Sequence, residues 1–270
     1  MKVVLSRKGF DSEFGSSPSP ILPDGKMISL PIPSDKDYVK YCELKLADNK
    51  TYYDLIKELK IKGLDENSTC HLDPDIYKNI LKRPDGWNPI FGQIGAAESH
   101  LRKQGIKEGD LFLFFGSFRK TKYENKEIVF DKSPEIHATF GYFQIGKIIK
   151  PYSENEKIEN WMKNHPHIAS DRIKNHLNTV YIARDNLSWN DKLPGAGAFY
   201  FDEKLVLTKN GLSKSKWNLP EIFRAVKISY HKNPWKNGYF QSASKGQEFV
   251  IEENDKIEKW VKDLIQNNYQ

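Results

Sequence analysis

The chain has 270 residues, of which 38% are hydrophobic and 29% are charged. This length can enclose a sizeable core, and the composition excludes an intrinsically disordered protein. The apolar runs fall far short of the ~20 residues that a membrane-spanning helix needs. The formal net charge of +6 favours a polyanionic partner such as nucleic acid, although a lysine-rich genome would produce the same balance.

The amino-terminal stretch MKVVLSRKGF has only three apolar residues after its first lysine, which is too few for the apolar region of a signal peptide. Cys42 and Cys70 form no CxxC motif, so we expect free thiols in a reducing compartment rather than a zinc ribbon or a redox pair. Both observations predict a cytoplasmic protein without a membrane partner.

In the first half of the chain, strands and helices are predicted to alternate. A short apolar strand at 2–5 leads into a segment rich in Gly, Ser and Pro, where five prolines exclude a regular helix. Beyond it, apolar residues at helical spacing predict helices and continuous apolar runs predict buried strands. These signals give a helix that begins at Thr51, a helix at 95–104, and strands at 111–115 and 137–149.

The second half contains two similar segments, ENEKIENWMK (154–163) and ENDKIEKWVK (253–262). Both predict an amphipathic helix, and Ser153 and Glu156 have the spacing of a capping box. Either an internal duplication or convergence on a good amphipathic helix explains the similarity. Between the two helices, strands are predicted at 181–184, 198–201 and 204–208.

Together these elements predict an α/β or α+β fold. We expect a single domain over residues 1–270, with a mixed, strongly twisted sheet flanked by helices. Two intimately packed halves, 1–150 and 151–270, are the alternative organisation.

The first candidate site follows the first strand, which ends in charged residues at the sheet edge where sites in α/β folds often lie. Arg7 and Lys8 are candidates for binding a phosphate, Arg7 through a bidentate fork. Asp11 is a candidate general base or ribose ligand, and Ser6 is added as a substrate-binding residue. The small residues that follow let a ligand approach the backbone. The alternative is a surface loop with solvated charges.

The segment HLDPD (71–75) supplies the second candidate site. In an extended segment His71, Asp73 and Asp75 would point the same way, an arrangement that a metal site can use. No second ligand cluster is evident, so we assign no metal ligand. We interpret Asp73 as a catalytic carboxylate, the alternative to Asp11 as general base, and His71 and Asp75 as substrate-binding residues. A structural turn is the alternative, because Asp before Pro commonly starts a turn.

The segment GQIGAAESHLR (92–102) leads into a helix whose amino terminus can receive an anion, but it lacks the Lys and Ser/Thr of a P-loop. Gln93 and His100 are substrate-binding candidates here, and tight helix packing through the glycines is the alternative. Arg119 is a further substrate-binding candidate. We interpret HPH (165–167) as a helix terminator rather than as a ligand pair.

Near the carboxyl terminus, FQSASKGQEFVI (240–251) precedes the last predicted strand. Lys245 and Gln247 are substrate-binding candidates, and Glu248 is a catalytic candidate that would orient a sugar or base edge. The pattern loosely resembles ADP-ribosyltransferases, although Gly246 stands where that family has Gln or Glu. We expect this segment and the Arg7–Asp11 tip to line one pocket.

Several of these pieces together resemble the third nucleotide-modification-associated domain family: SRKGFDS, HLDPD, FGQIGAAESHLRKQGIKEGDLFLFFGSFR, HATFGYFQIGKII and GQEFV. That family consists of bacterial and phage proteins assigned to DNA base hypermodification. The resemblance spans nearly the whole chain. It implies DNA or a nucleotide as partner, and other modification or defence proteins as further partners. It implies no particular catalytic residue, and the cofactor stays unknown.

Residues 108–150 are separately similar to part of the PUA-like and EVE-like barrels, which form a pocket for a modified or flipped base. This similarity implies barrel elements within the sheet. A pocket that grips an extruded base needs stacking rings and hydrogen bonds to the base edge.

The sequence therefore predicts a protein that binds a nucleotide or flipped base and takes part in its modification as an enzyme. A non-catalytic reader of modified bases is the main alternative. An ADP-ribosyltransferase-like enzyme and an interaction component of a defence system are the others. The reaction and its donor substrate stay open.

Overall fold

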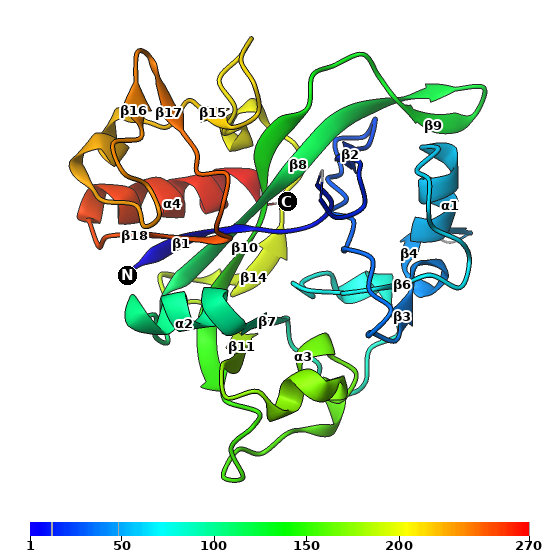
Figure 1. Cartoon of the computed structure of the whole chain (residues 1–270), viewed down its shortest axis with the longest axis horizontal. Coiled ribbons are helices and arrows are strands. Elements are labelled where there is room, and N and C mark those ends of the chain that lie inside the picture. Colours follow the sequence, from blue (N-terminus) through cyan, green and yellow to red (C-terminus); the bar gives the residue numbers. More distant parts are fainter. Residues whose placement is uncertain (12, 48, 270) are drawn as a thin grey trace.

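One large mixed sheet organises the molecule, in a computed structural model that describes residues 1–11, 13–47 and 49–269 (Figure 1). Nine strands of these residues belong to the sheet, and its main path runs β18-β1-β8-β10-β11-β7. Six of the nine strands lie on this path. The other three lie off it, because β2 and β9 pair with β8 and β14 pairs with β10. The nine are β1 (Val3–Arg7), β2 (Ser19–Ile21), β7 (Ile90–Ile94), β8 (Leu111–Glu124), β9 (Glu127–Phe130), β10 (Ile136–Ile149), β11 (Asn178–Ala183), β14 (Ala196–Ala198) and β18 (Glu248–Ile251).

The long strands β8 and β10 form the centre, because their apolar runs can be buried on both faces. The first eight residues of β8 are all buried. β1 runs parallel to β8, and β18 runs antiparallel to β1 with Ser6 opposite Glu248. The end of β1 therefore lies beside the start of β18, although 242 positions separate these two residues in the chain.

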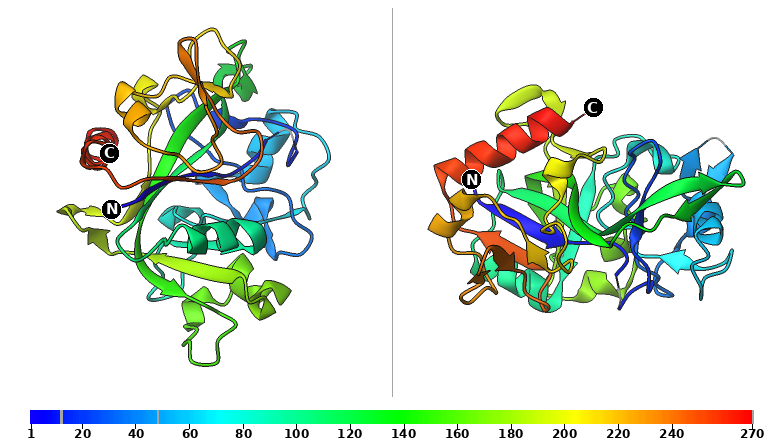
Figure 2. Two further views of the ribbon diagram at one scale, coloured as in Figure 1. Left: turned by 60° about the vertical axis from the view of Figure 1, so that its left-hand side comes forward. Right: turned by 90° about the horizontal axis from the view of Figure 1, so that it is seen from above.

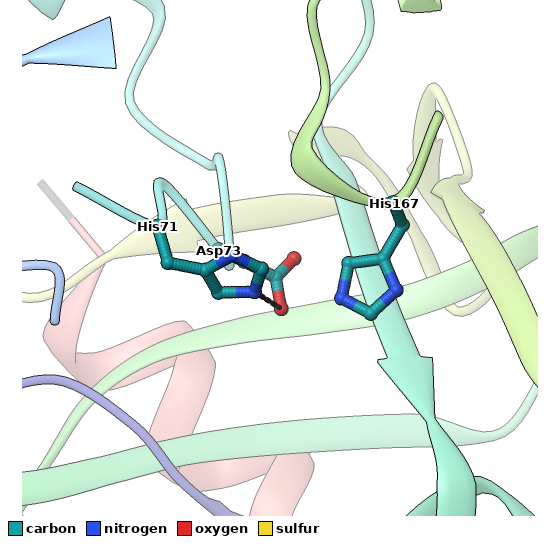
Figure 3. Close-up of side chains that lie close together, drawn as sticks. All are labelled: His71, Asp73 and His167. Carbon is teal, nitrogen blue, oxygen red and sulfur yellow. Dashed lines mark ion pairs between the residues drawn. The ribbon is translucent and has the colours of Figure 1, made fainter. Parts of the chain in front are cut away.

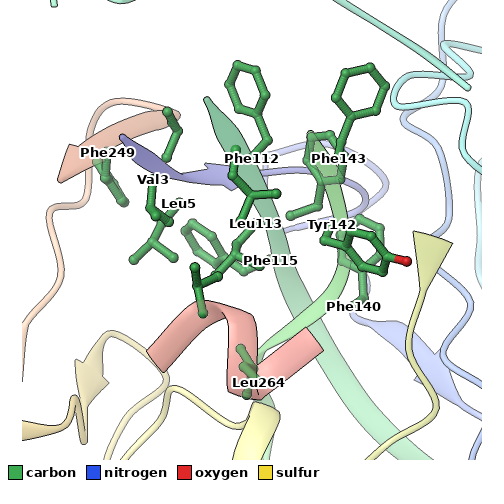
Figure 4. Packing of buried hydrophobic residues seen from close by; sticks show 14 of the residues in the cluster. Val3, Leu5, Phe112, Leu113, Phe115, Phe140, Tyr142, Phe143, Phe249 and Leu264 are labelled. Carbon is green, nitrogen blue, oxygen red and sulfur yellow. The ribbon is translucent and has the colours of Figure 1, made fainter. Parts of the chain in front are cut away.

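Different elements cover the two faces of the sheet. Figure 4 shows Leu264 of α4 (Asp255–Asn268) on the side of Phe115, with Phe112 and Phe143 on the other side. On that second side the ring centroid of Phe91, from β7, lies 4.9 Å from that of Phe112. Since β7 is three strands away from β8 in the sheet order, this contact requires the sheet to curl.

The curled sheet does not close into a barrel, because the edge strands β7 and β18 share no backbone pairing within the described residues. A side-chain hydrogen bond from Gln93 to Glu248, 2.6 Å long, joins the two edges instead. The predicted single α+β domain with a mixed sheet flanked by helices is confirmed. The barrel that the PUA-like similarity implied is not formed. Within the described residues the α-helices are α1 (Tyr52–Glu58), α2 (Gly95–Lys103), α3 (Pro166–Ala169) and α4.

A second hydrophobic cluster lies at the opposite end of the molecule from α4, around α1 (Figure 2). α1 begins as predicted, because the side chain of Thr51 accepts a hydrogen bond from the Asp54 N–H and satisfies one free donor of the first turn. Two short ribbons flank this cluster, which also buries Cys70. They pair β3 (Val39–Lys40) with β6 (Thr69–Cys70) and β4 (Lys45–Ala47) with β5 (Lys50–Thr51).

Three predictions about the second half were wrong. Residues 153–159 form no helix, and only the short 3-10 turn η3 (Asn160–Met162) follows them. The strand predicted at 198–201 ends at Ala198, and a 3-10 turn, η5 (Glu203–Leu205), occupies the start of 204–208. The remaining strands make two small ribbons: β12 (Asn186–Leu187) with β13 (Asn190–Pro194), and β17 (Tyr239–Gln241) between β15 (Lys216–Trp217) and β16 (Trp235–Lys236).

None of the helices in the described part of the chain has the length and apolar character required to cross a membrane.

Candidate functional site

A pocket of about 680 Å³ opens where β1 and β7 end. Its walls come from segments that are far apart in the sequence: the tip after β1, the loop at 32–35, the HLDPD segment, the end of β7, α3, and the loop before β18. The pocket therefore joins the amino-terminal tip to the segment before β18. The predicted site residues that line it are Arg7, Lys8, Asp11, His71, Asp73, Gln93, Lys245 and Gln247.

Glu248 lies beneath this pocket and holds two of its lining residues. Its Oε1 accepts hydrogen bonds from Lys8 Nζ at 3.1 Å, Gln93 Nε2 at 2.6 Å and Ser6 Oγ at 3.0 Å. Glu248 and Ser6 are fully buried, and neither lines the pocket. The Lys8 ammonium also lies 4.3 Å from the ring centroid of Phe91. In this arrangement Glu248 holds Lys8 and Gln93, and its carboxylate is not among the groups that line the pocket.

The terminal nitrogens of Arg7 and Oδ1 of Asp11 already have partners in the chain, whereas Nε of Arg7 is buried without one among the described residues. Arg7 donates to the backbone carbonyl of Ala243 at 2.9 Å and to that of Ser244 at 3.3 Å. Burial lowers the pKa of Arg7 from its usual value. Oδ1 of Asp11 accepts the N–H groups of Glu13 and Phe14, which is the pattern of an Asx turn. Both side chains therefore shape the pocket wall.

The deep end of the pocket holds His71, Asp73 and His167, and one potential ligand atom from each lies within 4.8 Å of the other two (Figure 3). His71 and Asp73 precede β7, and His167 belongs to α3. Nε2 of His71 is 4.0 Å from Oδ2 of Asp73, and the two imidazole centroids are 5.3 Å apart. This His/Asp/His group combines two nitrogen donors and one carboxylate, which is a set of ligands that a metal ion can use.

Neighbouring side chains fix the orientation of both imidazoles. Nδ1 of His71 lies 2.8 Å from the Asp37 carboxylate, and Nδ1 of His167 lies 2.7 Å from Oδ1 of Asn178. Arg172 holds Asp37 in turn through both terminal nitrogens. In each imidazole Nδ1 is therefore hydrogen-bonded to a side chain of the protein.

Asp73 is held by the residues around it as well. Its Oδ1 accepts the Gly92 N–H at 2.7 Å and lies 3.3 Å from Nε2 of His165. Nδ1 of His165 accepts the His167 N–H, so Nε2 is the protonated nitrogen in the neutral ring. It lies near Asp73 but lacks the geometry of a hydrogen bond. The remaining oxygen of Asp73 faces His71.

Burial and hydrogen bonding shift the pKa values of this group. Burial lowers the pKa of His167 to about 3. Burial acts to raise the pKa of Asp73, but the neighbouring His165 and His167 and, to a smaller extent, the charge of Lys8 outweigh it, and the pKa lies well below its usual range. The same balance holds for Asp37, where hydrogen bonds from His71 and Arg172 overcome burial and lower the pKa. Both carboxylates are therefore ionised at neutral pH.

Gly92 is the residue that lets α3 approach β7. A Cβ at this position would lie 2.3 Å from the imidazole of His167, which is far inside van der Waals contact. The ring of His167 therefore rests against bare backbone. α3 begins at Pro166, a favoured first helical residue because its missing N–H would have no helical partner.

Besides Ser6, three of the substrate-binding candidates do not reach the pocket. Asp75 forms two hydrogen bonds with Arg83, of 2.6 and 2.7 Å. The predicted alternation fails because residues 71–74 are not in a regular strand. His100 contacts Ser229 Oγ at 2.9 Å from its place on α2. Arg119, in the outer half of β8, lies over the ring of Phe130.

His167, Asp37, Arg172 and Asn178 were missed by the sequence reasoning. The HPH motif begins the short helix α3 and does not terminate one, so the interpretation of HPH was wrong. Two histidines on either side of a proline were the one available signal for His167. Asp37 and Arg172 pair across 135 positions, and no local pattern marks such a pair.

Comparison with known protein families gives one match: the model described as nucleotide modification associated domain 3 fits residues 2–252. The match covers every segment that lines the pocket. Neither the curated proteins nor the solved structures contain a significant match.

Proposed function

The chain belongs to the nucleotide modification associated domain 3 family, and from this premise we propose that its pocket binds a nucleotide or an extruded DNA base and that the protein takes part in modifying it. The single observation that carries the proposal is the pocket itself, because it gathers distant charged segments of the family domain around a buried His/Asp/His group. Its volume of about 680 Å³ lies within the range of about 300–1,000 Å³ that is usual for small-molecule sites.

The cations of the pocket suit a phosphate at the rim. Lys245 is exposed in the loop before β18, and its ammonium makes no hydrogen bond to the described residues. Lys8 lies deeper and is nearly buried, with its charge balanced by Glu248. A nucleotide bound with its phosphate near Lys245 would direct its base or sugar toward Lys8, Gln93 and the His/Asp/His group.

The lining favours a catalyst over a reader of modified bases. A reader needs only stacking and hydrogen bonds to the base, whereas this lining brings ionisable groups together and has Phe14 as its only phenylalanine, tyrosine or tryptophan among the described residues. Asp73 is the carboxylate that lies at the deep end. Asp11, the other candidate base, is engaged in its turn and faces no histidine among the residues described.

Binding of deoxynucleoside monophosphates and short single-stranded oligonucleotides, measured by isothermal titration calorimetry, tests the proposal. Lys245→Glu should weaken binding at least about tenfold, because it reverses a charge at the phosphate position; tenfold corresponds to about 1.4 kcal/mol. Lys236→Glu, an exposed lysine on β16 that does not line the pocket, is the matched control. Equal weakening by both variants would reject the pocket as the binding site.

A further inference from the structure

We propose that His71, Asp73 and His167 bind one divalent transition-metal ion at the deep end of the pocket. The inference names a cofactor for this site and relies on the proposed function only for what the ion would act on. It refines the role of Asp73 from general base to metal ligand, and it adds His167, which no sequence motif assigned.

The distances fit a mononuclear centre. Ligand atoms about 2.1 Å from one ion lie about 3–4 Å from each other. Nε2 of His71 and Oδ2 of Asp73 are 4.0 Å apart, and all three ligand atoms lie within 4.8 Å of one another. Small side-chain rotations are enough to close such a group around an ion. His71 and Asp73 are on one segment and His167 on another, so the ion would also join the HLDPD segment to α3.

The hydrogen-bond pattern leaves three lone pairs facing each other. A carboxylate only accepts, so Asp37 requires a proton on Nδ1 of His71. The Asn178 amide nitrogen donates to the His167 carbonyl at 2.8 Å, which turns its oxygen toward Nδ1 of His167 and requires a proton there too. In the neutral rings both Nε2 atoms are therefore bare, and they face the carboxylate of Asp73. Three converging acceptors without a donor among the described residues are the arrangement that a cation satisfies.

The outer contacts have the form found around metal sites. Histidine ligands usually donate their second ring nitrogen to a carboxylate or another oxygen, which fixes the ring. Here Asp37 and Asn178 do so. The Gly92 N–H donates to Oδ1 of Asp73, and Nε2 of His165 lies 3.3 Å from the same oxygen. We assign Asp37, Asn178 and His165 as positioning residues.

The ligand set selects the class of ion. Two imidazoles and one carboxylate with open positions suit iron(II), cobalt(II) or zinc(II). Magnesium and calcium prefer oxygen ligands alone. The three residues supply only part of a coordination sphere, and they line the pocket. The open positions would therefore face the space where the nucleotide is proposed to bind.

Titration of the metal-free full chain with cobalt(II) tests the inference through the visible d–d absorption of the bound ion. We expect one equivalent to bind with a dissociation constant in the micromolar range or below, and millimolar magnesium not to displace it. His71→Ala and His167→Ala should each lose at least about 100-fold in affinity, and Asp37→Asn about 10- to 100-fold. His176→Ala, which removes an exposed histidine away from the pocket, should bind cobalt like the wild type.

X-ray absorption of the wild-type cobalt protein needs no variant and so does not depend on whether a variant folds. Two imidazoles in the first shell are expected, and none or one overturns the inference. The inference is also overturned if no cobalt binds at 100-fold excess, or if the folded variants His71→Ala and His167→Ala bind cobalt with unchanged affinity. Nucleotide binding is measured separately in metal-free protein. A chain that binds cobalt but no nucleotide contradicts only the proposed function, and one that binds nucleotide but no cobalt contradicts only the metal site.

Discussion

Glu248 illustrates, at the scale of single residues, how burial decides what a charged group does. The segment GQEFV suggested a carboxylate that orients a ligand. In the structure this carboxylate is fully buried and binds Ser6, Lys8 and Gln93 through Oε1, while Oε2 has no partner among the described residues. A buried carboxylate is stable only when it is paired, so Lys8 is the neighbour on which Glu248 depends.

Removal of Lys8 should therefore destabilise the fold. Lys8→Met leaves the Glu248 charge buried without its cation, and we expect a loss of about 3 kcal/mol in the free energy of unfolding, measured by urea denaturation. The double variant Lys8→Met/Glu248→Gln should recover much of this loss, because the buried charge is gone.

Lys120→Met is the matched control, since its partner Glu203 and Lys120 itself are exposed and such pairs contribute less than about 1 kcal/mol. A Lys8→Met effect no larger than that of Lys120→Met would contradict the role given to the Lys8–Glu248 pair.

Residue chemistry indicated part of the site from sequence alone. His71, Asp73 and Lys8 were identified because their segments combine turn residues with charge, and Gln93 because it precedes a helix amino terminus; all four line the pocket. Their roles stay predictions. His167 and Asp37 escaped notice because their partners are distant in the chain, and hydrogen-bond partners such as Asn178 carry no local signature.

At the scale of elements, the two similar segments at 154–163 and 253–262 adopt different structures. The second forms the start of α4, whose buried stripe continues through Leu264 and Ile265. The first has only a short stripe before Pro166, which cannot donate a helical hydrogen bond. The burial of one amphipathic turn does not offset the unfavourable free energy of helix nucleation.

This difference predicts different effects of two equivalent substitutions. The Asn254 side chain caps α4 by accepting the N–H groups of Lys256 and Ile257, so Asn254→Ala should cost about 1 kcal/mol of unfolding free energy. Asn155 occupies the same place in the other segment, is exposed, and precedes no helix. Asn155→Ala should change the stability by no more than about 0.5 kcal/mol. Equal effects in thermal denaturation would show that the cap is not formed.

At the scale of the whole molecule, the sequence predicted a mixed sheet but not how the sheet curls. Continuous apolar runs at 111–115 and 137–149 correctly marked the central strands β8 and β10. The pairing of β18 with β1, and the curl that brings Phe91 onto Phe112, depend on contacts between distant segments. The same long-range pairing creates the pocket, so its existence was an expectation that no local pattern could establish.

The core also makes stability depend on pH. His137 is buried beside Phe115 and accepts the Trp217 indole N–H, and burial lowers its pKa to about 3 from a usual value of 6.5. Between these values the unfolded chain binds a proton that the folded chain does not, so stability falls as pH drops below about 6.5. Each such histidine contributes a slope of up to about 1.4 kcal/mol per pH unit.

Urea midpoints between pH 7 and pH 4 measure this slope. His137→Gln should reduce it by about one proton, whereas His176→Gln, at an exposed position, should leave it unchanged. Identical slopes in wild type and His137→Gln would show that His137 does not carry the effect.

The most direct test of the proposed role is mass spectrometry of nucleosides from the DNA of the native host. Cells that lack the gene are compared with cells complemented by the wild type or by Asp73→Asn, with equal amounts of folded protein. We expect a modified nucleoside that is present with the wild type and lost in both the deletion and the Asp73→Asn strain. The same set of nucleosides in all strains would contradict a role for this pocket in modification.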